Sequence, residues 1–531
     1  MPVQHVPVLV VGGGLAGMSA VLFLAHHGVP SLLVEQHRTT SIHPKARGQS
    51  PQTMEALRIA GIADRARAAG PAGGAGLHIT IAESIVGPTL HTIVEDAPDL
   101  AHLSPAGFAM ASQERMEPIL AERATELGAQ LRFSTRLETF TQDADGVTAT
   151  LRDATTGQVE AVRTDYLVAA DGHRSAIRAA LGIGTHGRGS LNHYLMWVFE
   201  ADLAHLIDDR TVTLYYLQNP VLHGGNGALV TTDHSGRYVL AVEYHPEHGE
   251  SPADFTAQRA AEQIRAGVGI PDLSVRILHS DRTEFAAQVA DRFSLGRIHL
   301  IGDAAHVMPP TGGQGGNTAI MDGFYLAWKL AMVVTGAAGS GLLDSHDAER
   351  RPVTELLVEQ QYANLVARMA PHLADGSEVA PIDSATLFLG YRYPTGAIVG
   401  EPGDDGSLLE DPSAPTGRPG SRAPHVRLVR DDVPISTIDL FGDSFVLLTG
   451  SRGQHWREAA DEVSQRLGIR LDTHQIGAGG MADPAGTWTT RYRVSDPDAV
   501  LIRPDRFIAW RSTGHSHPPE LEAALRHILD R

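Results

Sequence analysis

The sequence has 531 residues, a length that suggests two to four domains. Of these residues 42% are hydrophobic and 20% are charged, which is ordinary for a soluble globular protein. The formal net charge of −19 argues against binding to nucleic acid or to an anionic membrane surface. There is no cysteine, which excludes disulfides, thiolate metal sites and cysteine nucleophiles.

An uncharged stretch from Val8 to Ala25 has the length at which a membrane span is considered. Glycines interrupt its middle, and no lysine or arginine precedes it. A strand that turns into a helix explains this pattern better than a membrane helix or a secretory signal. We therefore expect a soluble, cytoplasmic protein without a membrane partner.

The first turn has the pattern of a dinucleotide-binding fingerprint. A buried strand over residues 6–11 runs into Gly12-Gly13-Gly14-Leu15-Ala16-Gly17, and the strand after the following helix ends at Glu35. Gly12 permits the tight turn, Gly14 admits a pyrophosphate to the helix N-terminus, and Gly17 lets the helix pack on the strand. Glu35 would accept hydrogen bonds from an adenosine ribose. Either a nicotinamide or a flavin cofactor fits this pattern.

Polar stretches follow the next two strands. His43-Pro-Lys-Ala-Arg47-Gly48 carries two cations. We expect them to bind cofactor phosphates or an anionic substrate, and the alternative is an ordinary solvated loop. Ser112 is a candidate N-cap of a helix, and residues 131–152 alternate like a β-hairpin. The strand over residues 164–169 leads to Asp171-Gly172 and a helix start, and ligands of open α/β sheets bind at such strand ends.

Residues 190–285 differ from the segments around them. They alternate like strands and contain one helix, over residues 253–267. We predict an antiparallel sheet that is inserted between two parts of the nucleotide-binding domain and covers a substrate cavity at the interface.

The most specific stretch runs from Gly302 to Asn317. A buried strand leads into a turn with Asp303, then Pro309-Pro310, a glycine-rich loop and a helix. Proline favours an extended path, glycines let a ligand approach the backbone, and bare amides at a helix N-terminus attract electron-rich ligand atoms. The stretch predicts a seat for a large polar cofactor, with an ordinary glycine-rich connection as the alternative.

The three turns at Gly12, Asp171 and Gly302 together resemble the class A flavoprotein monooxygenases of the para-hydroxybenzoate hydroxylase type, over about residues 5–370. Three further stretches are similar to the branch that hydroxylates aromatic polyketides: His43-Pro-Lys-Ala-Arg-Gly, Gly390-Tyr-Arg-Tyr393 and Ser421-Arg-Ala-Pro-His425. The resemblance implies an α/β fold. Its expected parts are a Rossmann-like FAD-binding domain (1–185 and 286–400), an inserted antiparallel β-sheet substrate domain (186–285) and a thioredoxin-like C-terminal domain (401–531).

The fingerprint and the resemblance together predict FAD as cofactor and NADPH or NADH as co-substrate. The predicted cofactor-binding residues are Gly12, Gly14, Leu15, Ala16, Gly17, Glu35, Gln36, Arg47, Gln113, Asp171, Asp303, Pro310, Gly313, Gly315, Gly316 and Asn317. The predicted catalytic residues are Arg47, Pro309 and Tyr216. Tyr215, His223 and Tyr244 are alternatives to Tyr216 as the group that helps to deprotonate a phenol.

The implied reaction is hydroxylation of a polycyclic aromatic polyketide or related phenol by O2, through a flavin hydroperoxide. A Baeyer–Villiger oxygenase acting on a polyketide ketone, a flavin dehydrogenase or reductase, and a flavin-binding partner subunit are the alternatives. We expect no metal site, because the histidines at 26–27, 245–248 and 515–517 have no convincing third ligand in the sequence. Without a Cys-x-x-Cys pair the C-terminal domain is expected to be structural. The oligomeric state is expected to be a monomer or a homodimer.

Overall fold

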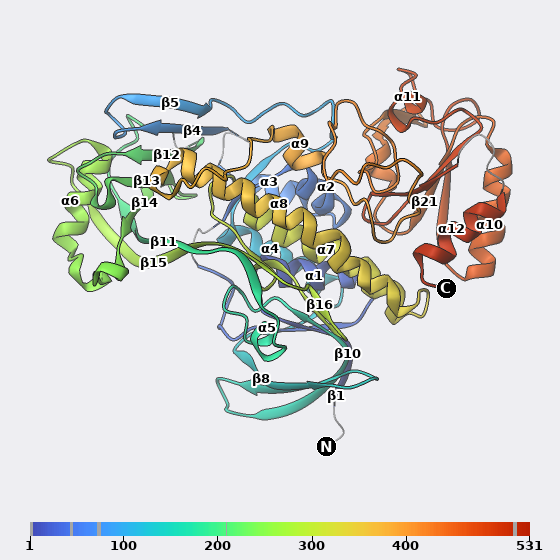
Figure 1. Cartoon of the computed structure of the whole chain (residues 1–531), viewed down its shortest axis with the longest axis horizontal. Coiled ribbons are helices and arrows are strands. Elements are labelled where there is room, and N and C mark those ends of the chain that lie inside the picture. Colours follow the sequence, from blue (N-terminus) through green and yellow to red (C-terminus); the bar gives the residue numbers. More distant parts are fainter. Residues whose placement is uncertain (1–3, 43–45, 72–75, 209, 513–517) are drawn as a thin grey trace.

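The computed structural model describes residues 4–42, 46–71, 76–208, 210–512 and 518–531. The central domain lies between a second sheet, on the left in Figure 1, and the C-terminal domain, on the right. The long helix α8 (Asp344–Arg368) crosses the middle of the molecule between these two ends. In the part of the chain that is described, no helix is both long and apolar enough to span a bilayer.

The central domain is built on a mainly parallel sheet in the order β16-β17-β10-β1-β2-β7. Its strands are β1 (Gln4–Val11), β2 (Ser31–Val34), β7 (Gln130–Arg132), β10 (Val159–Ala169), β16 (Ser294–Leu295) and β17 (Ile298–Leu300), and the predicted hairpin β8 (Thr135–Gln142) and β9 (Val147–Asp153) pairs with β10. In register, Val11 lies opposite Val34 and Ala169, and Ala169 lies opposite Leu300. The segments after β1, β2, β10 and β17 therefore meet at one edge, as the strand-end argument predicts.

Two helices from distant parts of the sequence pack tightly on this sheet. They are α1 (Leu15–His26), which follows β1, and α7 (Gln314–Val334), which follows the 302–313 loop. A Cβ placed on Gly323 would lie 2.6 Å from the Ala20 nitrogen, and the Ser19 hydroxyl donates to the Ile320 carbonyl at 2.6 Å. This close packing sets the N-termini of both helices side by side.

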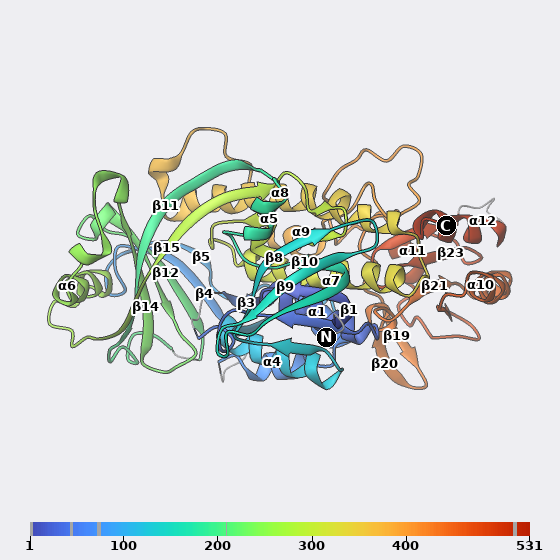
Figure 2. The ribbon, with the colours of Figure 1, turned by 90° about the horizontal axis from the view of Figure 1, so that it is seen from below.

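The second sheet has eight strands in the order β18-β15-β11-β14-β13-β12-β4-β5. They are β4 (Leu77–Ala82), β5 (Thr89–Val94), β11 (Thr185–Glu200), β12 (Val212–Gln218), β13 (Asn226–Thr231), β14 (Arg237–Tyr244), β15 (Arg276–Ala290) and β18 (His306–Val307). Helix α6 (Ala257–Val268) packs on one face, and the long strands β11 and β15 connect the sheet to the central domain (Figure 2).

This sheet extends beyond the predicted segment 186–285. Strands β4 and β5 come from the glycine- and alanine-rich region near residue 80, and β4 pairs in parallel with β12. The sheet is therefore mixed rather than purely antiparallel. The pairing satisfies the edge of β12, a long-range requirement that leaves no local sign in either segment.

The C-terminal domain has a four-stranded sheet in the order β22-β21-β23-β24. Its elements are β21 (Phe445–Thr449), α10 (Gln454–Leu467), β22 (Leu471–Gln475), α11 (Trp488–Tyr492), β23 (Ala499–Ile502), β24 (Ile508–Arg511) and α12 (Pro518–Ile528). Strands β21 and β22 are parallel, whereas β23 and β24 are antiparallel to their neighbours. This βαβ unit followed by a ββα unit confirms the thioredoxin-like fold, here in a chain without cysteine.

Buried polar contacts join the C-terminal domain to the central domain. Glu55 on α2 (Pro51–Ile59) is fully buried and forms ion pairs with Arg422 and Arg506. The Trp328 indole on α7 donates to Asp505 at 2.9 Å. The remaining elements are β3 (Arg47–Gln49), α3 (Ala63–Ala68), β6 (Ala109–Ser112), α4 (Gln113–Glu126), α5 (Ala176–Ala180), α9 (Ser384–Leu389), β19 (Arg427–Arg430) and β20 (Val433–Ser436).

Candidate cofactor and active site

The turn between β1 and α1 leaves no room for side chains. Gly12 has φ of 108°, and a Cβ there would lie 2.1 Å from the Ala170 oxygen. A Cβ on Gly17 would lie 1.9 Å from the Gly12 oxygen. Gly14 is the N-cap of α1 and provides no side-chain cap, so the first amides of the helix are left for a ligand. The geometry suits a pyrophosphate.

Glu35 is held over this turn at the end of β2. Its Oε2 accepts from the Gly13 amide at 2.6 Å, and its Oε1 accepts from the His37 amide at 2.8 Å. Its side chain is 12% exposed, and the neighbouring Gln36 is exposed. The carboxylate thus lies at the strand end where the ribose of a dinucleotide is expected.

Asp171 stabilises the turn after β10. Its Oδ1 accepts from the Ser175 hydroxyl at 2.5 Å and its Oδ2 from the Ile177 amide at 3.1 Å, at the start of α5. Arg178 on α5 donates to the Ala304 carbonyl at 2.8 Å. The structure thus brings the Asp171 turn against the Gly302 turn, while direct contact of Asp171 with the cofactor stays a prediction.

The turn after β17 is fixed from beneath by a buried carboxylate. Asp322 on α7 accepts from the Gly302 amide at 2.9 Å, from His306 at 2.6 Å and from Arg350 at 3.0 Å. Burial alone would raise the pKa of Asp322, but His306 and Arg350 hold it well below its ordinary value. The exposed Asp303 is thereby presented on a rigid turn at the edge of the sheet.

The N-terminus of α7 is as bare as that of α1. Gly313 is its N-cap, with φ of 65° and no side-chain cap. A Cβ on Gly316 would lie 3.0 Å from the Ala46 Cβ and 3.3 Å from Leu15. Leu15, together with Ala16 against Gly302, therefore packs α1 against this loop. Pro309 is buried, Pro310 is exposed and Gly315 is partly exposed.

Asn317 ties the start of α7 to β3. Its Oδ1 accepts from the Ser50 amide at 2.8 Å and the Thr53 hydroxyl at 2.7 Å, and its Nδ2 donates to the Gly48 and Gly313 carbonyls at 3.1 and 2.7 Å. The side chain is thus saturated by the protein. Direct contact of Asn317 with the cofactor therefore stays a prediction, and its side chain is engaged by the protein.

Gln113 is also held by protein contacts. Its backbone amide donates to the Ala46 carbonyl at 2.7 Å, and its side-chain Nε2 donates to Glu117 at 2.6 Å. These bonds fix the start of α4 against the segment that leads into Arg47. His43, Pro44 and Lys45 of the same predicted basic loop lie outside the described residues.

Arg47 lies between the α7 N-terminus and the second sheet. Its carbonyl oxygen is 3.9 Å from the position of a Cβ on Gly313. Its side chain is 11% exposed and forms an ion pair with Asp233, which follows β13. Burial lowers the pKa of the Arg47 guanidinium, against the charge of Asp233. The partner Asp233 is absent from the sequence-based prediction, because a single aspartate in a hairpin carries no local signal.

Tyr216 is the candidate helper that faces the central domain. It packs in a cluster with Leu365 and Met369 at the end of α8, and the nearby Arg368 opposes the rise of its pKa that burial causes. Arg368 also donates to the carbonyl of Thr311, in the loop after Pro309. Arg368 is a second residue that the sequence does not reveal.

The other three candidate helpers lie on the opposite face of the second sheet. Tyr215 and Tyr244 belong to the cluster around α6, and the His223 ring contacts Phe255 of that cluster and pairs with Glu250 at 2.9 Å. Side chains of adjacent residues in a strand point to opposite faces, so Tyr215 and Tyr216 cannot both reach the central domain.

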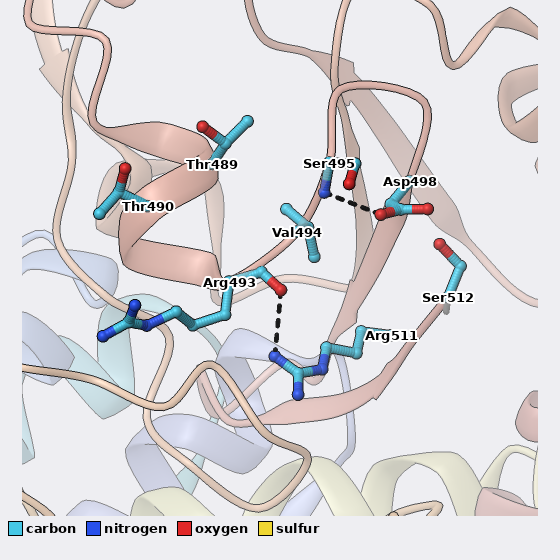
Figure 3. Close-up of a pocket in the computed structure, with 8 residues that line it drawn as sticks. All are labelled: Thr489, Thr490, Arg493, Val494, Ser495, Asp498, Arg511 and Ser512. Carbon is cyan, nitrogen blue, oxygen red and sulfur yellow. Dashed lines mark hydrogen bonds between the residues drawn. The ribbon is translucent and has the colours of Figure 1, made fainter. Parts of the chain in front are cut away.

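Two other features lie away from these turns. A polar cavity of about 580 Å³ in the C-terminal domain is shown in Figure 3, where Arg511 donates to the Arg493 carbonyl at 3.4 Å, and no predicted site residue lines it. His245, Glu247 and His248 place ligand atoms within 4.8 Å of one another on an exposed turn, where His245 and Glu247 already pair at 2.9 Å. His515 to His517 lie outside the described residues.

The residues at the sheet edge fit FAD. Two bare helix N-termini lie side by side, a carboxylate stands at the end of β2, and a second stands on the turn after β17. Glycines keep side chains out of the closest approaches. This donor set matches the phosphates and hydroxyls of a dinucleotide.

Comparison with known proteins supports the same identity. Residues 5–361 match the FAD binding domain family, and residues 416–531 match the aromatic-ring hydroxylase C-terminal domain. Aklavinone 12-hydroxylase of Streptomyces purpurascens is 43% identical over 540 residues, with 99% of each chain covered. The 4-methyl-5-nitrocatechol 5-monooxygenase of a Burkholderia species is 40% identical, over 100% of this chain and 98% of its own.

Solved structures agree. Aklavinone-11 hydroxylase, in a ternary complex with FAD and aklavinone, superposes with a TM-score of 0.94 at 42% identity and full coverage of both chains. A flavin-dependent monooxygenase with FAD and substrate gives 0.90 at 33% identity, also with full coverage. These matches confirm the predicted resemblance, fold and cofactor. The chain belongs to the FAD-dependent aromatic-ring hydroxylases, a branch of the class A flavoprotein monooxygenases.

Proposed function

We propose that this enzyme hydroxylates a polycyclic aromatic polyketide, or a related phenol, with FAD, O2 and NADPH or NADH. Relatives named for aklavinone support the polycyclic substrate, and the relative named for a nitrocatechol supports the phenol. We propose that it acts in the cytoplasm as a monomer or a homodimer.

One observation carries the proposal: Arg368 lies beside Tyr216 of the second sheet and donates to the carbonyl of Thr311, in the loop after Pro309. Tyr216 is 3% exposed, and apolar side chains surround it. A phenol that enters between the sheet and this loop would find a hydroxyl partner on an otherwise apolar wall. That is the environment an aromatic hydroxylase needs, because water must be kept from the reacting centre.

Within this proposal, the residues at the sheet edge hold the cofactor. The α1 amides after Gly14 would bind the pyrophosphate, Glu35 and Asp303 would accept hydrogen bonds from cofactor hydroxyls, and the α7 amides from Gly313 would contact the flavin. When bound, FAD would supply the redox chemistry that activates O2 with electrons from NADPH or NADH. The protein supplies binding, orientation and the exclusion of water.

Tyr216 and Arg368 are proposed to control the proton of the substrate phenol. Burial raises the pKa of Tyr216, and the charge of Arg368 opposes this rise. The Tyr216 hydroxyl would hydrogen-bond to the substrate oxygen, while Arg368 favours negative charge on the pair. A phenol closer to its phenolate is more electron-rich on the ring carbons.

The test uses purified protein, NADPH, and two probes of different size, aklavinone and 4-methyl-5-nitrocatechol, under ¹⁸O₂. The expected result is bound flavin that absorbs at about 450 nm, O2 consumption, and one labelled hydroxyl on an aromatic ring. Insertion of the label as an ester oxygen would identify a Baeyer–Villiger oxygenase. Electron transfer without O2 consumption would identify a dehydrogenase, and either result would overturn the proposal.

A further inference from the structure

Asp233 lies in the loop between β13 and β14, where the second sheet reaches the central domain. Its carboxylate side chain is only 1% exposed. A carboxylate buried in a connecting loop is costly unless charged or hydrogen-bonding groups surround it. Here those groups come from the central domain.

The contacts place Asp233 between two arginines. Its Oδ1 accepts from Arg47, and its Oδ2 accepts from the Ser112 amide at 3.3 Å and lies 3.4 Å from Nε of Arg115. Arg115 also donates to the Asp233 carbonyl at 3.0 Å. The hairpin loop is therefore attached to β3, β6 and the first turn of α4 through one side chain.

This attachment leaves one nitrogen of the Arg47 guanidinium, which carries two N–H donors, without a partner among the described residues. That nitrogen, Nη1, is buried. A buried guanidinium N–H without an acceptor is costly, so binding is favoured when a ligand supplies an acceptor. Because the guanidinium is charged, the best acceptor is an anionic oxygen.

Such an oxygen has two sources beside Arg47. The Arg47 backbone lies against Gly313, at the helix end that receives the cofactor, and its side chain reaches the second sheet, which covers the substrate. A phosphate oxygen of FAD or of the nicotinamide is one source. The phenolate oxygen of the substrate is the other.

We propose that Asp233 is a positioning residue that aims Nη1 of Arg47 at an anionic oxygen of a bound ligand. One guanidinium, that of Arg47, then both attaches the second sheet to the central domain and binds the anion. This deepens the proposed function, since it states how the sheet affects binding at the cofactor edge.

The test compares Asp233→Asn, which keeps the shape but removes the charge, with Asp233→Glu, Arg47→Ala and the double variant Asp233→Asn/Arg47→Ala. His234→Ala, in the same loop, and Asp208→Asn, an exposed aspartate paired with Arg210, are the matched controls. The measurements are the FAD Kd from flavin fluorescence, the KM for NADPH, and the Kd of a phenolic probe from the flavin spectrum. Circular dichroism and thermal melting show that each variant is folded.

Asp233→Asn is expected to weaken one of these affinities about tenfold or more, Asp233→Glu is expected to recover part of the loss, and both controls are expected to stay near wild type. The double variant should be no worse than Arg47→Ala, because Asp233 acts through Arg47. A loss confined to FAD or NADPH, together with weaker competition by inorganic pyrophosphate in the variant, identifies a phosphate oxygen. A loss confined to the phenolic probe identifies the phenolate.

Additive losses in the double variant, or Asp233→Asn behaving like His234→Ala while Arg47→Ala is impaired, would overturn the inference. FAD binding and the non-additivity are measured without turnover. They therefore test Asp233 even if no polyketide is hydroxylated, which keeps this result separate from that of the proposed function.

Discussion

Glu349 on α8 and Arg503 in the C-terminal domain form a bidentate ion pair, with oxygen–nitrogen distances of 2.6 and 2.8 Å and side chains no more than 1% exposed. Lys329 on α7 donates to the same carboxylate at 2.6 Å. Burial alone would raise the pKa of Glu349, but Arg503 and Lys329 hold it below its ordinary value. The carboxylate thus joins two helices of the central domain to the C-terminal domain.

Replacing Glu349 with alanine should lower the free energy of unfolding by about 3–5 kcal/mol, since two buried cations lose their shared partner. Chemical denaturation at pH 7 measures the loss. Glu355→Ala on the same helix removes a partly exposed ion pair with Arg351 and should cost about 1 kcal/mol or less. Equal losses in the two variants would show that the buried pair has no special role.

Gly17→Ala should abolish FAD binding, because its new Cβ would lie 1.9 Å from the Gly12 oxygen and would force the fingerprint turn open. Flavin content per protein, read from absorbance, measures the effect. Gly400→Ala is the matched control, since nothing lies within 4 Å of its Cβ position. A Gly17→Ala protein purified with a full complement of FAD would contradict the packing argument.

The free energy of unfolding should fall as pH drops from about 6.5 toward 4. The upper limit is the ordinary histidine pKa in the unfolded chain, and the lower limit is set by two buried histidines of the folded state. Burial lowers the pKa of His299 to about 3 and that of His346 to about 4. Between these values and 6.5 only the unfolded state binds the protons. Above pH 6.5 neither state binds these protons and no stability is lost. The loss between pH 6.5 and the folded-state pKa is about 3 kcal/mol for His346.

Urea denaturation of the wild type and of His346→Gln at pH 7.5, 6 and 5 tests this dependence. Glutamine cannot titrate, and its amide replaces the imidazole that pairs with the Leu300 carbonyl at 3.0 Å. The variant should lose less stability than the wild type between pH 7.5 and 5. The same loss in both proteins would exclude His346 as a source of the acid sensitivity.

Asn317→Asp should weaken FAD binding about tenfold, because a carboxylate cannot donate to the Gly48 and Gly313 carbonyls that the amide now satisfies. The Kd from flavin fluorescence reports the change. Asn219→Asp, just after β12, removes the donor of one bond to the Ala266 carbonyl on α6 and should leave the Kd unaltered. A normal Kd for Asn317→Asp would show that the hydrogen bonds from Asn317 to β3 and Gly313 do not shape the FAD-binding site.

The local parts of this architecture can be predicted from the sequence. The run of apolar residues in β1 and the spacing of Gly12, Gly14 and Gly17 are consequences of short-range packing, and short-range packing leaves a pattern. The same holds for the turn at Gly302. Strand alternation also places Tyr215 and Tyr216 on opposite faces, but it does not say which face meets the central domain.

Long-range partners leave no such pattern. Strand β4 joins the second sheet across more than a hundred residues of intervening sequence, and its own residues do not name β12 as the neighbour. Asp233 and Arg368 gain their significance only from what folding places beside them. The second sheet also includes β4, β5 and β18, which lie outside the predicted segment 186–285.

The buried contacts of Glu55 bear on how such enzymes can be recombined. Glu55 lies on the helix that directly follows the Arg47 strand, and its counter-ions Arg422 and Arg506 both come from the far end of the chain. A chimaera with a C-terminal module from another hydroxylase would have to bring both arginines with it. Otherwise the chimaera would leave the buried Glu55 carboxylate without its two arginine partners, close in sequence to Arg47.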